Sequence, residues 1–422
     1  QKDARGVITL YSFDNLNRFT DITYPSAPEE NIHYDYDDVS VNAVGRLVVT
    51  SDQTGSTDLA YNGMGYITKT EQTIGDTTYG MQYHYDDANQ LEAIQYPSGL
   101  MVRYYRDELG QVEAITQQVN ENSPEDTVAE NISYLAFGPM NSMQLGNGLT
   151  QENRYDLDYR IESIALKSDN TPLSNKAYDY NAVSQITSIT DELIASNNKS
   201  YEYDRLNRLT DVIEGDELQS VRQERFSYDA VGNRETYQRV ANGQEVISEQ
   251  YHYSDDANRL MSVDRTTGST QSQRVLGYDS VGNTINDAKF DDTSLQLTYG
   301  ANNRLTTVKG ASYGHNAKGQ RVIRNVNGIE VHYIYDTQNR LVAEAEEGVV
   351  TREYVYIGRV PLAVLDATND EWYYSLNDHL GTPKVLTDQN QQVVWSGEAL
   401  AFGKTEESGS VDFRFRFPGQ IE

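Results

Sequence analysis

The chain has no cysteine, no long apolar run and few basic residues. Without cysteine, its 422 residues form neither disulfides nor thiolate metal sites. The segment "VPLAVL" at 360–365 is typical of its longest apolar runs, and a membrane-spanning helix needs roughly 20 residues, so membrane insertion is not expected. The 34 basic residues are outnumbered by 64 acidic ones, and the net charge of −30 repels nucleic acids and anionic membranes.

The familiar signatures of catalysis are also missing. The sequence has no Gly-x-x-x-x-Gly-Lys-Ser/Thr, no His-Glu-x-x-His and no Gly-x-Ser-x-Gly, and its six histidines share no metal-ligand spacing. The acidic stretches "YDYDD" (34–38) and "FDDTS" (290–294) could bind Ca²⁺ through carboxylates. Neither has the glycine and closing glutamate of an EF-hand loop, which favours solvated turns. We therefore expect a chain with no catalytic residue, metal or cofactor.

The sequence contains a short motif that recurs many times, here called the phrase. Two examples are "FSYDAVGNRE" at 226–235 and "YEYDRLNRLT" at 201–210. An aromatic residue precedes Asp, two residues follow, and then come Gly or Asn and often Arg or Gln. Fifteen degenerate copies recur at a mean step of about 23 residues, a period typical of repeat architectures. They start at Asp14, Asn42, Asn62, Asp86, Asp107, Leu135, Asp156, Asn181, Asp204, Asp229, Asp255, Asp279, Gly300, Asn316 and Asp336.

Each copy predicts a tight turn between two strands. Asp or Asn can accept hydrogen bonds from the backbone ahead of it, and a fourth-position glycine such as Gly232 or Gly282 accepts the left-handed conformation. The flanks alternate Tyr, Thr, Val and Ile with polar residues, and Gly-containing spacers mark a second turn in each period. We predict an all-β protein, a strip of antiparallel hairpins wound into a hollow spiral shell, closed or incomplete, with one face exposed to water.

The phrase resembles the repeats of the Rhs/YD-repeat family. Near the C-terminus, "YYSLNDHLGTPKVLTD" (373–388), "VVWSGEALAFGK" (393–404) and "RFRFPGQIE" (414–422) are similar to the core segment of that family. The resemblance divides the chain into a repeat strip at 1–371 and the start of the core segment at 372–422. Its motif residues are Asp378, His379, Gly381, Pro418 and Gly419.

The resemblance implies a shell that encloses a C-terminal toxin or effector domain in a secreted or cell-surface bacterial protein. The family's aspartyl self-cleavage motif would lie beyond Glu422, so the chain is expected to be a non-enzymatic part of the shell. Its expected partners are the cargo and a flanking shell segment or partner subunit. If the excess carboxylates face inward, the cargo should be basic.

Two alternatives use the same strip differently. The first is a cell-surface or wall-associated protein that binds other cells or carbohydrate, with stacked tyrosines forming the binding face. The tyrosines could equally form cross-strand ladders that fix the register, which their position before nearly every turn favours. The second is a carbohydrate-active enzyme, which needs a carboxylate pair outside the repeat turns. Although His379 beside Asp378 suggests acid–base chemistry, the motif favours a structural turn.

Overall fold

The computed structural model describes residues 1–120, 122–136, 138–216, 219–291 and 293–416. This part of the chain forms 36 β-strands, and every strand pairs antiparallel with the next one in sequence. Its helices are three single 3-10 turns, Pro28–Glu30, Val39–Val41 and Ala195–Asn197. The predicted all-β strip of hairpins is confirmed.

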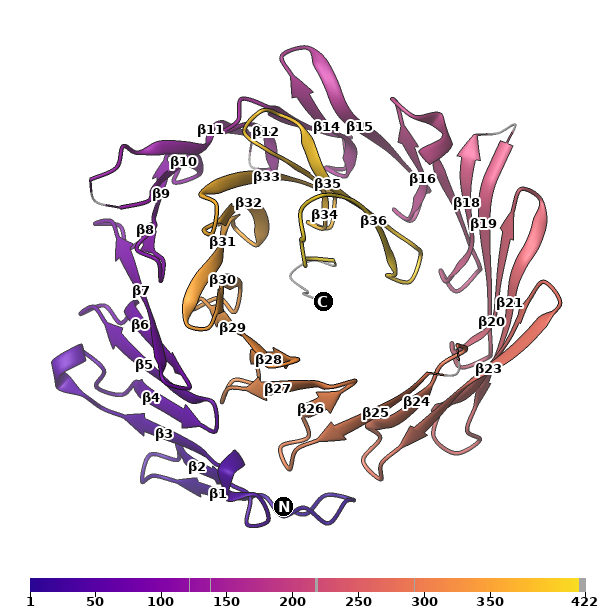
Figure 1. Ribbon diagram of the computed structural model, residues 1–422. Coiled ribbons are helices and arrows are strands. Elements are labelled where there is room, and N and C mark those ends of the chain that lie inside the picture. Colours follow the sequence, from indigo (N-terminus) through magenta and orange to yellow (C-terminus); the bar gives the residue numbers. More distant parts are fainter. Residues whose placement is uncertain (121, 137, 217–218, 292, 417–422) are drawn as a thin grey trace.

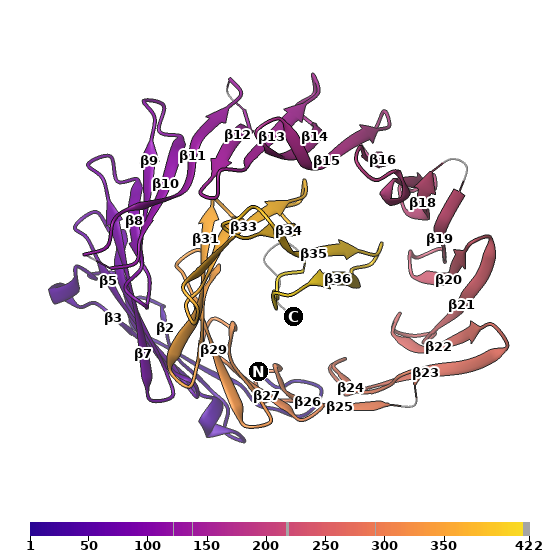
Figure 2. The same ribbon diagram turned by 45° about the horizontal axis from the view of Figure 1, so that its top comes forward.

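The strip winds into a spiral with more than one turn, and its later strands lie inside its earlier ones (Figures 1 and 2). The first part of the outer turn consists of β1 (Leu10–Phe13), β2 (Phe19–Thr23), β3 (Ile32–Tyr36), β4 (Leu47–Asp52), β5 (Gly55–Tyr61), β6 (Ile67–Ile74), β7 (Thr77–Tyr85), β8 (Leu91–Gln95), β9 (Met101–Arg106), β10 (Val112–Gln118), β11 (Asp126–Tyr134), β12 (Met140–Leu145), β13 (Thr150–Tyr155), β14 (Ile161–Ser168) and β15 (Thr171–Tyr180).

The outer turn continues through a stretch that is covered only in part, because the last strands of the inner turn lie inside its first strands and little lies inside its later ones (Figure 1). Its strands are β16 (Ile186–Asp191), β17 (Lys199–Tyr203), β18 (Leu209–Asp216), β19 (Gln219–Tyr228), β20 (Arg234–Ala241), β21 (Gln244–Tyr253), β22 (Leu260–Thr267), β23 (Thr270–Tyr278), β24 (Thr284–Ala288) and β25 (Ser294–Tyr299).

The inner turn, orange to yellow in Figure 1, ends near the centre of the spiral. Its strands are β26 (Leu305–Val308), β27 (Ala311–His315), β28 (Arg321–Val326), β29 (Ile329–Tyr335), β30 (Leu341–Glu346), β31 (Val349–Ile357), β32 (Val360–Asp366), β33 (Glu371–Asn377), β34 (Pro383–Thr387), β35 (Val393–Ala399) and β36 (Thr405–Gly409). Because β33 pairs with both β32 and β34, the sheet continues across the motif boundary at 371–372.

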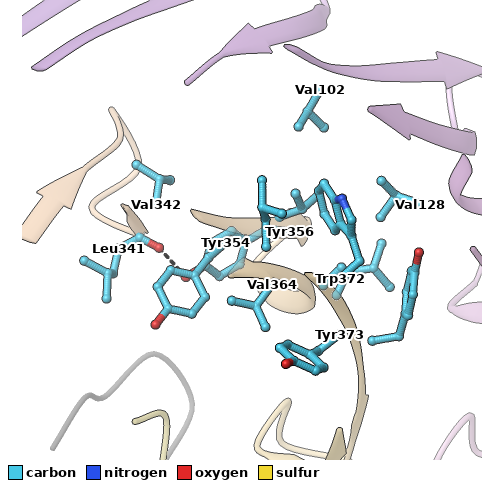
Figure 3. Close-up of a cluster of buried hydrophobic side chains, with 14 of the residues drawn as sticks. Val102, Val128, Leu341, Val342, Tyr354, Tyr356, Val364, Trp372 and Tyr373 are labelled. Atoms are coloured by element: carbon cyan, nitrogen blue, oxygen red, sulfur yellow. Dashed lines mark hydrogen bonds between the residues drawn. The ribbon is translucent and has the colours of Figure 1, made fainter. Parts of the chain in front are cut away.

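The largest core lies between the two turns, where β6–β14 face β28–β34. Ile94 and Val102 of the outer turn and Val342 and Val355 of the inner turn are fully buried in one cluster. Figure 3 shows Val102 and Val128 above Trp372, across the space between the two layers. The strip therefore buries one face by folding back on itself, which gives each layer the partner it needs.

Polar contacts link the two turns along their length. Arg5 donates to the backbone carbonyl of Gly300 at 2.8 Å, across 295 residues of sequence. Further on, the Arg222 guanidinium donates to Glu406 at 3.1 Å across only 184 residues. The sequence separation between contacting residues falls along the spiral because the inner turn has a smaller radius. It covers the arc between these two contacts with about half as many residues as the outer turn.

Candidate functional site

The repeated phrase builds one turn geometry, well illustrated at Asp204. Its backbone N–H donates to the Arg208 carbonyl at 2.9 Å, and Asn207 closes the loop by donating to the Asp204 carbonyl at 3.0 Å. One carboxylate oxygen of Asp204 accepts from the backbone N–H groups of Leu206 and Arg208, and the other accepts from the Arg208 guanidinium at 2.7 Å. Asn207 adopts the left-handed conformation at φ 64°. This geometry explains why the phrase favours Asp or Asn first and Gly or Asn fourth.

These hydrogen bonds favour the ionised carboxylate, and the Arg208 backbone N–H and side chain together lower the pKa of Asp204 below its ordinary value. At the fourth position of their turns, Gly232 and Gly282 each have φ 97°. The Asp side chain accepts from the backbone N–H four residues ahead at Asp14, Asp86, Asp107, Asp156, Asp229, Asp279 and Asp336 as well.

The turn at Asp255 differs from the one expected. Ser254 donates its backbone N–H to the Arg259 carbonyl at 2.8 Å, and its hydroxyl accepts from the Arg259 N–H at 3.2 Å. The loop holds one residue more than its counterpart after Tyr228, so the first position shifts to Ser254. Asp255 therefore lies inside the loop, where the structure records no capping hydrogen bond for it.

Other turns of the same geometry lie outside the fifteen copies. Asp3 accepts from the Val7 N–H at 3.0 Å, and Asp388 accepts from the Gln392 N–H at 2.7 Å. The segment Asp3–Gly6 matches the pattern and could have been found, whereas Asp388 has Gln391 in place of the expected Gly or Asn. Gln391 nevertheless takes φ 64°.

The motif "NDHLGT" forms a further turn of this kind. Asp378 accepts from the backbone N–H groups of Leu380 and Thr382 at 2.9 and 3.0 Å, and Gly381 has φ 81°. At the turn tip, His379 contacts the Tyr178 ring at a centroid distance of 5.2 Å, and burial lowers its pKa. The structure records no hydrogen bond between His379 and Asp378. Pro418 and Gly419 lie outside the described residues.

A tyrosine and an arginine connect each turn to the next. The Tyr228 hydroxyl donates to the Leu209 carbonyl of the preceding repeat at 2.7 Å, and the Arg208 guanidinium lies 4.8 Å from its ring centroid. The hydroxyl bond recurs at Tyr61, Tyr85, Tyr134, Tyr155, Tyr180, Tyr203, Tyr253, Tyr278, Tyr335 and Tyr356. Each of these hydroxyls donates to the backbone of the preceding repeat, as expected for ladders that fix the register.

Side chains of the two acidic stretches form an ion pair and turn hydrogen bonds within the protein. Asp37 pairs with Arg18 at 2.5 Å, and Asp38 accepts from the Ser40 N–H at the start of a 3-10 turn. In the second stretch, Asp291 accepts from Thr293. Across the described residues, no group of three or more His, Asp or Glu side chains is arranged to hold a metal ion.

Two cavities lie where the inner turn separates from the outer one. The larger, here called the inner cavity, has a volume of about 550 Å³ and is lined by β14–β19 and by the segment from β33 to the turn after β35. The smaller has about 250 Å³ and lies between β19–β23 and the turn at 400–404. Phe402 of that turn packs against Phe226 of the outer turn with ring centroids 4.8 Å apart, and both rings line the smaller cavity.

The linings of these cavities do not share the acidic excess of the chain. Their acidic residues are Asp191, Glu214, Glu224, Glu249, Asp378 and Glu398. Their basic residues are Lys176, Lys199, Arg222, Arg234, Arg265, Arg274, Lys384 and Lys404. These linings hold eight basic and six acidic residues, whereas the whole chain has 34 basic and 64 acidic residues. The charge of these linings therefore gives no support to a basic cargo, which stays a prediction.

Comparison with protein families gives two matches. Residues 198–360 match the teneurin YD-shell model, and residues 373–408 match the RHS protein model. The chain is also similar to tRNA nuclease WapA of Bacillus subtilis (strain 168), with 28% identity over 208 residues, 46% of this chain and 8% of that protein. The double-stranded DNA deaminase toxin A of Burkholderia cenocepacia (strain H111) is 26% identical over 219 residues, 49% of this chain and 14% of the toxin.

Solved structures show the same fold. The chain superposes over its whole length on TcdB2-TccC3 without its hypervariable C-terminal region, with a TM-score of 0.70, 15% identity and coverage of 24% of that chain. The TcdB2-TccC3-TEV structure gives a TM-score of 0.72 at 16% identity, again covering all of this chain and 24% of the other. The chain thus spans about a quarter of these structures and less than a sixth of either curated relative. Its described helices include none long and apolar enough to cross a membrane.

Proposed function

This chain belongs to the Rhs/YD-repeat family, and on that premise we propose that it is a non-enzymatic part of the wall of a hollow shell that encloses a toxin or effector domain. The observation that carries the proposal is the single spiral sheet whose later turn lies within its earlier one (Figure 1). A strip of paired strands wound in this way forms a wall between the space within the spiral and the surrounding solvent. The chemistry of its repeats is structural, because the turn carboxylates and the tyrosine hydroxyls form hydrogen bonds with backbone groups.

The direction of the chain after β36 supports the proposal. Phe413 packs against Trp395 at 5.1 Å and Phe415 against Tyr354 at 4.8 Å, both inside the spiral. Both phenylalanines are almost completely buried. Arg414 adds an ion pair to Glu344 at 3.1 Å. The chain is thereby fixed against the inner face up to Arg416, so a domain attached beyond this point would start from the inside.

The names of the relatives indicate which class of domain the proposed shell encloses. The names of the two curated relatives describe a tRNA nuclease and a DNA deaminase toxin, and the chain matches only a small part of each. We assign such activities to other parts of those proteins, and to this chain the task of keeping a comparable domain from its targets. In this proposal the protein acts outside the bacterial cell that makes it.

The free edge of β1 is a place for a flanking wall segment or partner subunit. Among the described strands, β1 pairs only with β2, which leaves its other edge without a strand. Leu10, Tyr11 and Phe13 of β1 are 43–52% exposed. An open, apolar edge strand readily accepts another strand, and natural proteins usually cover one.

Protease protection tests the enclosure in the full-length protein. A recognition sequence for a site-specific protease is placed directly after Glu422, and in a control protein it is placed at Leu157, a fully exposed turn residue. We expect rapid cleavage at Leu157 and cleavage after Glu422 only once the shell is unfolded. Equal cleavage rates at the two sites in the folded protein would exclude enclosure.

A further inference from the structure

The inner cavity contains hydrogen-bonding groups that nothing in the described structure satisfies. Tyr178 is only 6% exposed, yet the structure records no hydrogen bond for its hydroxyl, and the same holds for the half-buried Tyr201. Neither hydroxyl is among the enclosed side-chain atoms without a partner, so both face the open space of the cavity, where solvent or a ligand must supply the partner. Burial raises the pKa of both tyrosines, so both hydroxyls stay protonated and can donate as well as accept. A ligand with acceptor and donor groups would satisfy them.

The charges of the cavity are largely neutralised by one another. Lys176 pairs with Asp191 at 2.7 Å, and Lys199 pairs with Glu398 at 3.0 Å. Lys384 lies 3.8 Å from Asp378 and 4.0 Å from Glu398, and the structure records no hydrogen bond for its ammonium group. With four basic and five acidic side chains in its lining, the cavity attracts neither a strong anion nor a strong cation.

The rest of the lining is mainly apolar. Ile189, Val212, Leu376 and Val385 enter it from both layers of the spiral. Its volume of about 550 Å³ lies within the range of roughly 300–1,000 Å³ typical of ligand sites, which combine apolar walls with a few polar groups. Neutral donors and acceptors on an apolar wall are complementary to a peptide, whose amide groups are neutral and whose side chains can be apolar.

The same protein already holds one extended peptide in this manner. Phe413 and Phe415 pack on Trp395 and Tyr354 of the inner face, and the Tyr333 hydroxyl accepts from Arg414 between them at 3.3 Å. Aromatic side chains and phenol hydroxyls thus bind a chain segment on the inner side of the wall. The inner cavity offers the same chemistry in Tyr178 and Tyr201, without an occupant from the described residues.

We infer that the inner cavity binds an extended, uncharged, apolar peptide segment of the domain that the shell encloses. The inference rests on the proposed function and adds the place where wall and cargo touch. Its occupant comes from outside residues 1–422, and the Tyr178 and Tyr201 hydroxyls bind its backbone amides while its side chains contact the apolar lining. Binding at one site would tether the enclosed domain and leave the rest of it without specific contacts.

Photo-crosslinking in the full-length protein tests this. The photoreactive amino acid p-benzoylphenylalanine replaces Leu193, a lining residue that is 43% exposed, and in a control protein it replaces Leu157. Mass spectrometry of the irradiated protein should identify one apolar peptide from outside residues 1–422 attached at position 193 and none at 157. Attachment only to residues 1–422, or to a small molecule, would overturn the inference.

Variants of the hydroxyls sharpen the test. Tyr178→Phe together with Tyr201→Phe keeps both rings and should lower the crosslink yield at position 193 at least five-fold. The matched change Tyr253→Phe removes a hydroxyl that bonds the Arg234 carbonyl outside the cavity and should leave the yield unchanged. An undiminished yield in the double variant would refute the role of the hydroxyls. If the site after Glu422 stays protected while the crosslink is absent, only this inference fails; loss of that protection refutes the proposed function itself.

Discussion

Two stretches of the outer turn share the same repeat turns but are stabilised differently. In the double-layered arc, β6–β14 covered by β28–β34, the described part of residues 67–168 contributes 20 buried hydrophobic side chains. In the open wall, β16–β24, the described part of residues 179–290 contributes five, namely Val212, Phe226, Tyr251, Val263 and Leu276. The repeat turns are common to both stretches and therefore specify the sheet itself. The side chains on the strands between the turns determine whether a second layer packs on it.

Paired charges replace apolar burial on the inner face of the open wall. Arg274 binds Asp287 through two hydrogen bonds of 2.6 and 2.7 Å, and Arg265 binds Glu249 at 2.5 Å. Both carboxylate side chains are at most 10% exposed. Burying an ionised carboxylate is costly unless it is paired, so these arginines let a half-wet sheet face exist without a complete covering layer.

Truncating one isoleucine in each stretch should give the largest difference. Ile94 is fully buried between the two layers, whereas Ile189 is half-buried beside the inner cavity. We expect Ile94→Ala to lower the free energy of unfolding by about 2–5 kcal/mol and Ile189→Ala by about 1 kcal/mol, because only the first leaves a closed void. Urea denaturation measures both. Equal losses would show that the second layer adds no packing energy.

A single carboxyl makes the junction of the two layers sensitive to pH. Glu353 is fully buried, its carboxylate accepts from the Ser98 N–H at 3.1 Å and from the Ser98 hydroxyl at 2.7 Å, and burial raises its pKa to about 7. The folded state therefore holds a proton that the unfolded state releases above about pH 4.5, and stability falls as pH rises from about 4.5 to 7.

The matched variant for this group is Glu353→Gln, which keeps an acceptor for Ser98 and has no charge to bury. We expect it to be more stable than the parent at pH 8 by roughly 3 kcal/mol, since each unit of pKa shift corresponds to about 1.4 kcal/mol, and nearly equal at pH 4.5. Thermal unfolding at the two pH values measures this. A difference that does not grow with pH would contradict the expected protonation.

Much of this architecture could be predicted because the turn chemistry is local. Asp204, Leu206 and Asn207 specify their turn within five residues, so the phrase marked the hairpins and predicted the winding. The partner of Glu353 lies 255 residues away at Ser98, and no local pattern indicates that contact. No local pattern indicates the inner cavity either, because its lining residues Tyr178 and Lys384 come from different turns of the spiral. Net charge does not predict the near balance of charges in the two cavity linings, because composition averages over the whole surface.

In the open wall, removing one member of an ion pair should cost less than truncating the double-layered core. Arg274→Met leaves Asp287 without its partner, but the arginine side chain is 36% exposed and water can replace part of its interaction. We expect a loss of about 1–2 kcal/mol, recovered in part by the double change Arg274→Met with Asp287→Leu. A double-mutant cycle by urea denaturation measures the coupling. A cycle with zero coupling would show that apolar contacts alone hold this wall.

The smallest effect should come from single ladder hydroxyls, and its size should again depend on the second layer. Tyr228→Phe removes a half-buried bond to the Leu209 carbonyl and should cost about 0.5–1 kcal/mol, because water can reach the freed carbonyl. Tyr356, which donates to Leu341 at 2.6 Å and is 2% exposed (Figure 3), leaves a buried carbonyl unpaired when changed to Phe. That loss should exceed the first by about 1 kcal/mol. Unfolding free energies of the two variants measure the contrast, and a larger loss at Tyr228 would mean that the ladder, rather than the covering layer, carries the stability of the spiral.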